Sequence, residues 1–219
     1  MQAPKWERFA AVCGVLFVVL AVAGAALTEA GLPGSGATDA EVVAYYEDGD
    51  TELKRELGSN LVGFGVFFFL IFLGRLRSAL RDAEGGQGTF TAIAFAGGVV
   101  LAGLLLATAA FEASVASADG FFDSFDVDAD TAILLGSLTW WLAGFSLLAG
   151  GVMVGAASVV ALKTGFLPKW LAIAGLVLSA ISFFNEIAQA VIIPLMLVLV
   201  WIAIVSVMLV RRGAATSPA

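Results

Sequence analysis

The sequence contains no histidine, a single cysteine and few charged residues, 13% of the 219. Without histidine there can be no His-ligated haem, no His-containing zinc site and no His-based catalytic triad. One cysteine, Cys13, cannot form an intramolecular disulfide or a CxxC site, and its apolar surroundings predict a buried, inert thiol. No glycine-rich phosphate loop or nucleotide fingerprint is present. We therefore expect no cofactor, nucleotide or nucleic acid as a ligand.

Apolar residues take the place of the missing charges. They make up 60% of the chain and give a mean hydropathy of +0.99. Soluble domains are roughly 45–50% apolar and about 25% charged. A chain of this composition has too little polar surface to cover a body in water, so it is predicted to be an integral membrane protein in contact with the lipid bilayer.

Six apolar segments are long enough to cross a membrane, which takes about 20 residues. They lie at 9–27, 57–74, 90–111, within 131–162, at 166–184 and at 191–210. The predicted fold is all-α, a polytopic bundle of six transmembrane helices. The fourth segment is longer than a crossing requires, and we expect its first turns to project from the bilayer.

The basic residues predict the orientation. With six spans and a cytoplasmic N-terminus, nine of the eleven Lys and Arg residues lie on the cytoplasmic side, and only Lys54 and Arg55 lie outside. This assigns 1–8 and 213–219 as cytoplasmic ends of a transmembrane domain at 9–212. Outer loops are expected at 28–56 and 112–131, and a cytoplasmic loop at 75–89. The expected location is the plasma membrane.

A cleaved signal peptide is the competing interpretation of the N-terminus. Lys5, Arg8, an apolar stretch and the small residues 21–26 resemble one. The apolar stretch is longer than the roughly 7–15 residues usual in a signal peptide, so we favour an uncleaved first span.

The first outer loop is predicted to contain a short amphipathic helix. Thr38 and Glu41 have the spacing of a capping box, with Val42, Val43 and Tyr45 following. Two interpretations stay open for this helix. It lies in the membrane interface with its tyrosines at headgroup level, or it forms a lid or docking surface over the spans.

Two cytoplasmic motifs carry a family resemblance. The second span ends in Leu-Gly-Arg-Leu-Arg-Ser-Ala-Leu-Arg at 73–81, and Thr-Gly-Phe-Leu-Pro-Lys-Trp-Leu opens the fifth at 164–171. Together with the Glu-Val-Val-Ala-Tyr-Tyr segment at 41–46, they resemble an uncharacterised family of small six-span membrane proteins common in actinobacteria. The resemblance covers roughly residues 6–212. It implies a six-helix membrane fold and no particular activity.

Small residues at helical spacing predict close helix packing. Ala94 and Gly98, and likewise Gly151 and Gly155, form small-xxx-small patterns that let two backbones approach. A six-helix bundle has many internal seams, so packing within one chain is favoured over a dimer face. Leu147 is expected to face lipid.

The acidic loop between the third and fourth spans resembles a calcium site in its cluster of aspartates. Asp123, Asp126, Asp128 and Asp130 cluster there, but the glycine and glutamate required at the sixth and twelfth positions of an EF-hand are Thr131 and Ser137. We interpret it as a solvated acidic loop and predict no metal site.

A set of polar residues near the outer ends of the spans is the candidate site. Charged groups within a membrane are costly and often functional. The candidates for an outward-facing polar pocket are Asn60, Glu112, Asn185, Glu186 and Gln189. We expect Glu112 and Glu186 to reach the same depth. The alternative is that these residues only end helices at the interface.

The spans carry few polar groups, which favours a non-catalytic function. The leading hypothesis is an accessory or partner-binding membrane component, whose partner is another membrane protein or a second copy. The alternative is a transporter of ions or small solutes that uses the outer polar pocket. An enzyme is disfavoured because no nucleophile–base pair is recognisable.

Overall fold

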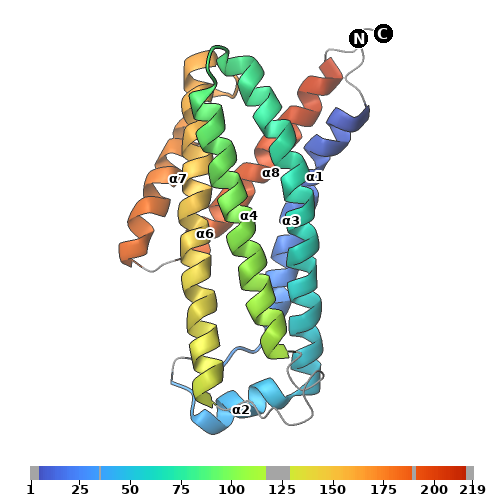
Figure 1. The fold of residues 1–219 in the computed structure, drawn as a ribbon, viewed down its shortest axis with the longest axis vertical. Helices are drawn as coiled ribbons and strands as arrows, with labels where there is room; N and C mark the ends of the chain where they lie inside the picture. Colours follow the sequence, from blue (N-terminus) through green and yellow to red (C-terminus); the bar gives the residue numbers. More distant parts are fainter. Residues whose placement is uncertain (1–4, 35, 117–128, 189–190, 216–219) are drawn as a thin grey trace.

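Apolar runs bounded by glycine, proline and charged residues fold into seven α-helices in the part of the chain that the structure describes. This computed structural model describes residues 5–34, 36–116, 129–188 and 191–215. The helices are α1 (Lys5–Thr28), α2 (Asp39–Glu47), α3 (Gly49–Glu84), α4 (Thr89–Ala116), α6 (Ala129–Thr164), α7 (Lys169–Ala188) and α8 (Ile192–Ala215), as Figure 1 shows. The predicted all-α class is confirmed.

Five of these helices are long and apolar enough to cross a bilayer. They are α1, α3, α4, α6 and α8. The described apolar part of α7, Lys169–Phe184, is shorter than a full span. The protein is therefore a helical membrane protein with five candidate spans, and α7 is the helix on which a count of six depends.

The helices extend further than the apolar segments alone predict. α3 continues through residues 75–84, where we expected a cytoplasmic loop, because Leu76, Ala79 and Leu80 remain buried on one face of the helix. α3 and α6 each contain 36 residues, or about 54 Å of helix at 1.5 Å per residue. Both exceed the hydrocarbon core of about 30 Å.

Neighbouring helices in the sequence pack side by side, and α8 returns to the first. α1 packs on α3, α3 on α4, α4 on α6 and α6 on α7, while α8 packs mainly on α1. The described chain therefore begins and ends at one end of the bundle, the terminal end, and α2 lies across the other, the α2 end (Figure 1). α8 is held to α1 by a hydrogen bond from the Ser206 hydroxyl to the Ala11 carbonyl.

Small residues form the helix seams. A methyl group added at Gly98 would collide with the Leu73 side chain of α3, and one at Gly151 would lie 2.6 Å from Ser182 Cβ of α7. Gly155 lies against Ser179 of α7 in the same way, and Ala94 is buried. These four residues thus lie at contacts within the chain.

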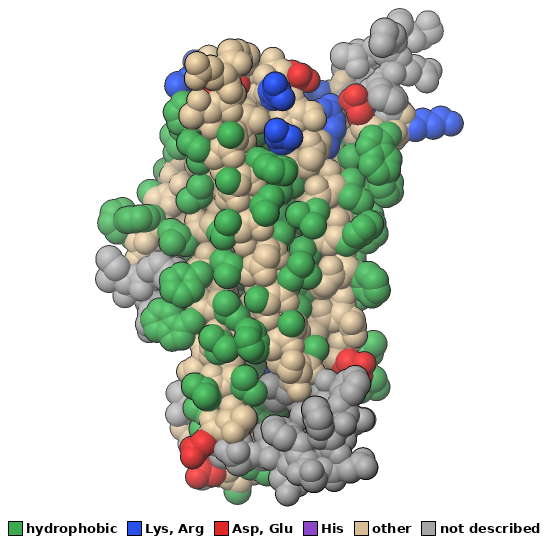
Figure 2. Space-filling model, viewed as in Figure 1, with side chains coloured by type: hydrophobic (Ala, Val, Ile, Leu, Met, Phe, Trp, Pro, Cys, Tyr) green, Lys and Arg blue, Asp and Glu red, His purple; other side chains and the backbone are tan. Residues whose placement is uncertain are grey.

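Leu147 lies in the core. We expected it to face lipid, but it is completely buried. α6 is covered on several faces, by α4, α7 and α8, so a position one turn from Gly151 does not reach the bilayer. The apolar side chains that do reach the surface cover the sides of the bundle in Figure 2.

Lys and Arg side chains gather at the terminal end (Figure 2). Arg75 pairs with Glu7 at 3.2 Å. Lys163 lies 4.4 Å from the ring centre of Phe90. Glu84 caps α4 by accepting hydrogen bonds from the backbone N–H groups of Phe90 and Thr91. This end of the bundle is therefore a polar layer held by local contacts.

We expect Gly151→Leu to destabilise the protein, because a leucine would force α6 and α7 apart at Ser182. Overpacking of this kind typically costs about 1–3 kcal/mol of unfolding free energy. The measurement is the thermal unfolding midpoint in lipid nanodiscs. Gly103→Leu is the matched control, because Gly103 is exposed and an added methyl there meets no atom within 4 Å. Equal midpoints for the two variants would contradict the seam.

Candidate functional site

The α2 end is organised by two helix caps. Thr38 and Glu41 form the predicted capping box, in which the Thr38 backbone N–H donates to Glu41 at 2.8 Å. That hydrogen bond lowers the pKa of Glu41. Asp48 caps α3 by accepting from the Thr51 hydroxyl at 2.7 Å and from its backbone N–H at 3.0 Å, and these bonds lower the Asp48 pKa. α2 is thereby fixed between the linker and the start of α3.

Arg55 lies in the second turn of α3 and is almost completely buried, with 3% of its surface exposed. Its guanidinium donates to the Glu112 carboxylate of α4, with 2.5 Å between Nη2 and Oε2. The Tyr46 ring of α2 lies 4.8 Å from the guanidinium carbon. Arg55 therefore joins α2, α3 and α4 at one point.

Glu112 and Tyr46 complete this buried cluster. The Thr139 side chain of α6 interacts with the Glu112 carboxylate, so a fourth helix contacts the cluster. Burial raises the pKa of the Tyr46 phenol. The neighbouring Tyr45 hydroxyl donates to the Ala30 carbonyl at 3.3 Å and anchors α2 to the end of the first helix.

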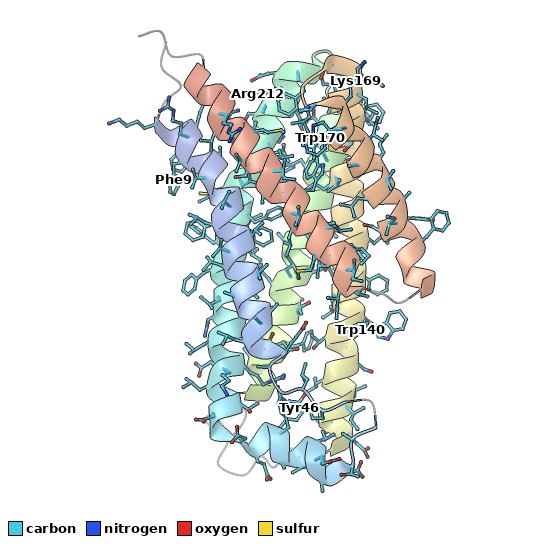
Figure 3. All side chains as sticks on the ribbon, turned by 180° about the vertical axis from the view of Figure 1, so that it is seen from behind. Phe9, Tyr46, Trp140, Lys169, Trp170 and Arg212 are labelled. Atoms are coloured by element: carbon cyan, nitrogen blue, oxygen red, sulfur yellow. The ribbon has the colours of Figure 1, made fainter. Side chains whose placement is uncertain are left out.

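A cavity of about 360 Å³ extends from this cluster into the bundle. Its polar end contains Arg55, Glu112, Ser59, Thr139 and Glu29, close to Tyr46. Its walls are mainly aliphatic and aromatic, and at the far end they include Phe17, Leu101, Val198 and Leu199. Figure 3 shows Tyr46 at the α2 end and Trp140 on α6, two of the residues that line it.

A second, wider depression of about 870 Å³ lies over the linker and α2. It is open to solvent, and the carboxylates that line it, Glu41 and Asp48, already serve as caps. The cavity inside the bundle is less open and is therefore the better candidate site.

Of the five residues predicted to form a polar pocket, the structure places Glu112 in the cavity. Asn60 is exposed and donates to the Glu56 carbonyl of its own helix at 2.9 Å, so it makes no part of the site. Asn185 and Glu186 belong to α7, but their side chains lie outside the described part of the structure, as does the whole of Gln189.

Glu186 and Glu112 are at different depths. Gly151 lies against Ser182. At a rise of about 1.5 Å per residue, Glu186 is about 6 Å beyond that contact toward the α2 end. Thr139, the partner of Glu112, is about 18 Å beyond it in the same direction. The expectation of equal depth assumed spans of equal length, whereas α7 ends partway along α6 (Figure 1).

Arg55, Ser59 and Tyr46 were missed in the sequence. The sequence places Arg55 in a charged segment on the outer side, just before the second span, and does not predict that it continues the buried face of α3. That face runs at helical spacing through residues 51, 55, 59, 66, 69 and 73. Extending the periodicity of the apolar span back into the charged segment would have identified Arg55 as buried.

The described residues contain no group of three or more His, Cys, Asp or Glu side chains that could hold a metal ion. Most of the acidic loop weighed as a calcium site, residues 117–128, lies outside the described part. No protein family model, curated protein or solved structure matches this chain.

We expect Arg55→Met and Glu112→Leu each to lower the unfolding free energy by about 3–5 kcal/mol, because either change leaves an unpaired buried charge. The double variant should be more stable than either single variant, since no charge is then left unpaired. Thermal unfolding of the four proteins in nanodiscs measures this coupling. As a control, Glu7→Ala breaks the more exposed pair with Arg75 and should cost about 0–1 kcal/mol. Additive losses from the two changes would contradict a coupled pair.

Proposed function

We propose that the protein crosses the plasma membrane six times, with both termini in the cytoplasm. α7 supports the sixth span, because Ile173, Val177 and Ile181 are exposed on the helix surface that does not pack on α6. The basic residues gathered at the terminal end favour that end as the cytoplasmic one. The resemblance to an uncharacterised family of six-span membrane proteins agrees with this topology, and we propose membership of that family.

A reporter fused after Ala219 should then report the cytoplasm, and one inserted after Gly34 should report the exterior. The physical reason is the retention of Lys- and Arg-rich segments on the cytoplasmic side. Paired alkaline phosphatase and fluorescent protein fusions provide the measurement. If both fusions report the exterior, the chain has an odd number of spans. If the C-terminal fusion reports the exterior and the insertion after Gly34 reports the cytoplasm, the α2 end is assigned to the wrong side.

We infer that the protein acts by binding a ligand within the membrane, as a non-catalytic component. The observation that carries this inference is a cavity that is closed at one end. It contains polar groups only toward the α2 end. Beyond Phe17 and Leu101 the bundle is filled by a buried apolar core, including Phe69, Leu76 and Ile202. A site of this form favours holding a ligand over passing it across the membrane.

Transport is the second candidate, and the Arg55–Glu112 pair favours it. Charged groups within spans commonly mark ion or proton pathways. Transport sites are usually near the bilayer midplane and face helix breaks. Here the pair lies toward one end of unbroken helices, which favours binding over transport.

Wild-type protein in liposomes should show no flux of protons, Na⁺ or K⁺ above that of empty liposomes, because the apolar core blocks a polar path. Glu112→Gln provides the comparison, since it removes the carboxylate charge and retains the side-chain shape. Fluorescent ion indicators inside the liposomes give the measurement. Robust wild-type flux that Glu112→Gln abolishes would establish transport and overturn the binding function.

A further inference from the structure

The length of the cavity matches the depth of one membrane leaflet. Leu101 lines the closed end and Glu112 lines the polar end, and both belong to α4. At about 1.5 Å per residue they are about 16 Å apart along the helix. This is close to half of the hydrocarbon core of about 30 Å. A lipid chain that reaches the bilayer midplane would therefore fill the cavity.

The volume of the cavity limits the ligand to a single chain. Ligand pockets in proteins range over roughly 300–1,000 Å³, and this cavity, at about 360 Å³, is near the lower limit. Aliphatic and aromatic residues such as Val62, Leu105 and Met196 form most of its walls. The site thus suits one alkyl chain better than the two chains of a phospholipid.

Two polar atoms at the end of the cavity lack partners. Neither Arg55 Nε nor Ser59 Oγ has a hydrogen-bond partner among the described residues, although Arg55 and Ser59 are only 3% and 4% exposed. An unpaired buried polar atom is costly, and a bound oxygen atom that accepts from Arg55 and Ser59 would remove this cost. The headgroup of the ligand is therefore expected to contain oxygen acceptors.

The charges at this end favour an uncharged headgroup. The positive charge of Arg55 is balanced by Glu112, and Glu29 adds a second carboxylate to the lining. An anionic headgroup would be repelled by the carboxylates. A cationic headgroup could not accept the hydrogen bonds that Arg55 Nε and Ser59 offer, and it would lie beside the Arg55 guanidinium.

One side of the cavity lies at the start of α8. α8 begins at Ile192, and its first turns line the cavity through Ile192 and Leu195. Figure 3 shows that toward the α2 end, beyond the start of α8, α1 and α6 flank this region on opposite sides. Residues of both helices line the cavity, among them Ala25 of α1 and Ala143 of α6, so we expect a lipid of the leaflet at the α2 end to enter on this side.

Building on the proposed binding function, we propose that the cavity binds the chain of a neutral single-chain glycerolipid of the outer leaflet. The glycerol and ester oxygens lie at Arg55 and Ser59, and the alkyl chain extends toward Phe17 and Leu101. The monoacylglycerols are the lipid class with this combination of one chain and an uncharged head rich in oxygen.

The test uses purified full-length protein in digitonin, whose rigid sterol body is too broad for a cavity of this size. 1-Monomyristoylglycerol is the probe, and myristate and tetradecyltrimethylammonium have the same chain with an anionic and a cationic head. Binding is followed by microscale thermophoresis and by native mass spectrometry. We expect 1-monomyristoylglycerol to bind with one-to-one stoichiometry and roughly tenfold or more tighter than either charged probe, because burying an unmatched charge is costly.

A pair of glycine variants tests the location. Gly136 lines the cavity on α6 at an exposed position, and an added methyl there meets no atom within 4 Å, so we expect Gly136→Phe to obstruct the cavity without unfolding the protein. Gly103→Phe is the matched control, at an exposed glycine of α4 with equally open surroundings. We expect Gly136→Phe to abolish binding of the probe, and Gly103→Phe to retain it.

A pair of serine variants tests the headgroup contact. Ser59→Ala should weaken binding by roughly five- to tenfold, the effect of one lost hydrogen bond. Ser158→Ala is the control, because Ser158 is also buried with an unpartnered hydroxyl but lies beside Gly175 of α7, away from the cavity. Its affinity for the probe should equal that of the wild type.

Two results would overturn the assignment of a neutral lipid to this cavity. The first is that the charged probes bind as tightly as the neutral one, and the second is that Gly136→Phe binds the probe as tightly as the wild type. Either result is independent of the liposome flux assay. A charged probe that binds in the cavity would leave the binding function intact and change only its ligand. Flux that depends on Glu112 would overturn the binding function itself.

Discussion

The buried ion pair between Arg55 and Glu112 is the constraint on which the α2 end of the molecule depends. Separating two opposite charges in a medium of low polarity is expensive, so α3 and α4 must stay in register there. Tyr46 packs on the same guanidinium and Thr139 interacts with the same carboxylate, so α2 and α6 are positioned by the pair as well. One contact thereby defines where the cavity ends and which polar groups face it.

The two ends of the bundle are packed in different ways. Toward the terminal end, glycine and serine let α6 and α7 approach closely, and large side chains such as Phe72 and Leu80 fill the interior. Toward the α2 end, α8 is absent because it begins at Ile192. The cavity therefore lies where α8 begins, and small residues such as Gly136 contribute to its lining.

Composition and periodicity predicted the helical membrane fold, the capping box at Thr38 and the presence of Glu112 in a polar site. They did not predict the partner of Glu112. A charged segment beside an apolar span was read as a loop, and only the three-dimensional packing shows that Arg55 faces inward. Asn60, five residues later, lies on the opposite face of the same helix and is exposed. Whether such a residue faces inward depends on how its helix is rotated about the helix axis. A single sequence predicts that rotation only where the pattern of buried residues continues without interruption along the helix.

The unequal lengths of the helices have a consequence for the surrounding bilayer. α3 and α6 have 36 residues each, while α7 has 20 and ends partway along α6 (Figure 1). The apolar part of α6, Ile133–Thr164, is about twice as long as that of α7, Lys169–Phe184, so the hydrophobic thickness of the protein differs between these two helices. Lipids adapt to such a mismatch by thinning or tilting, at a modest cost for each ångström. The bilayer is thus expected to be thinnest beside α7, and the orientation of the protein to respond to the chain length of the lipids around it.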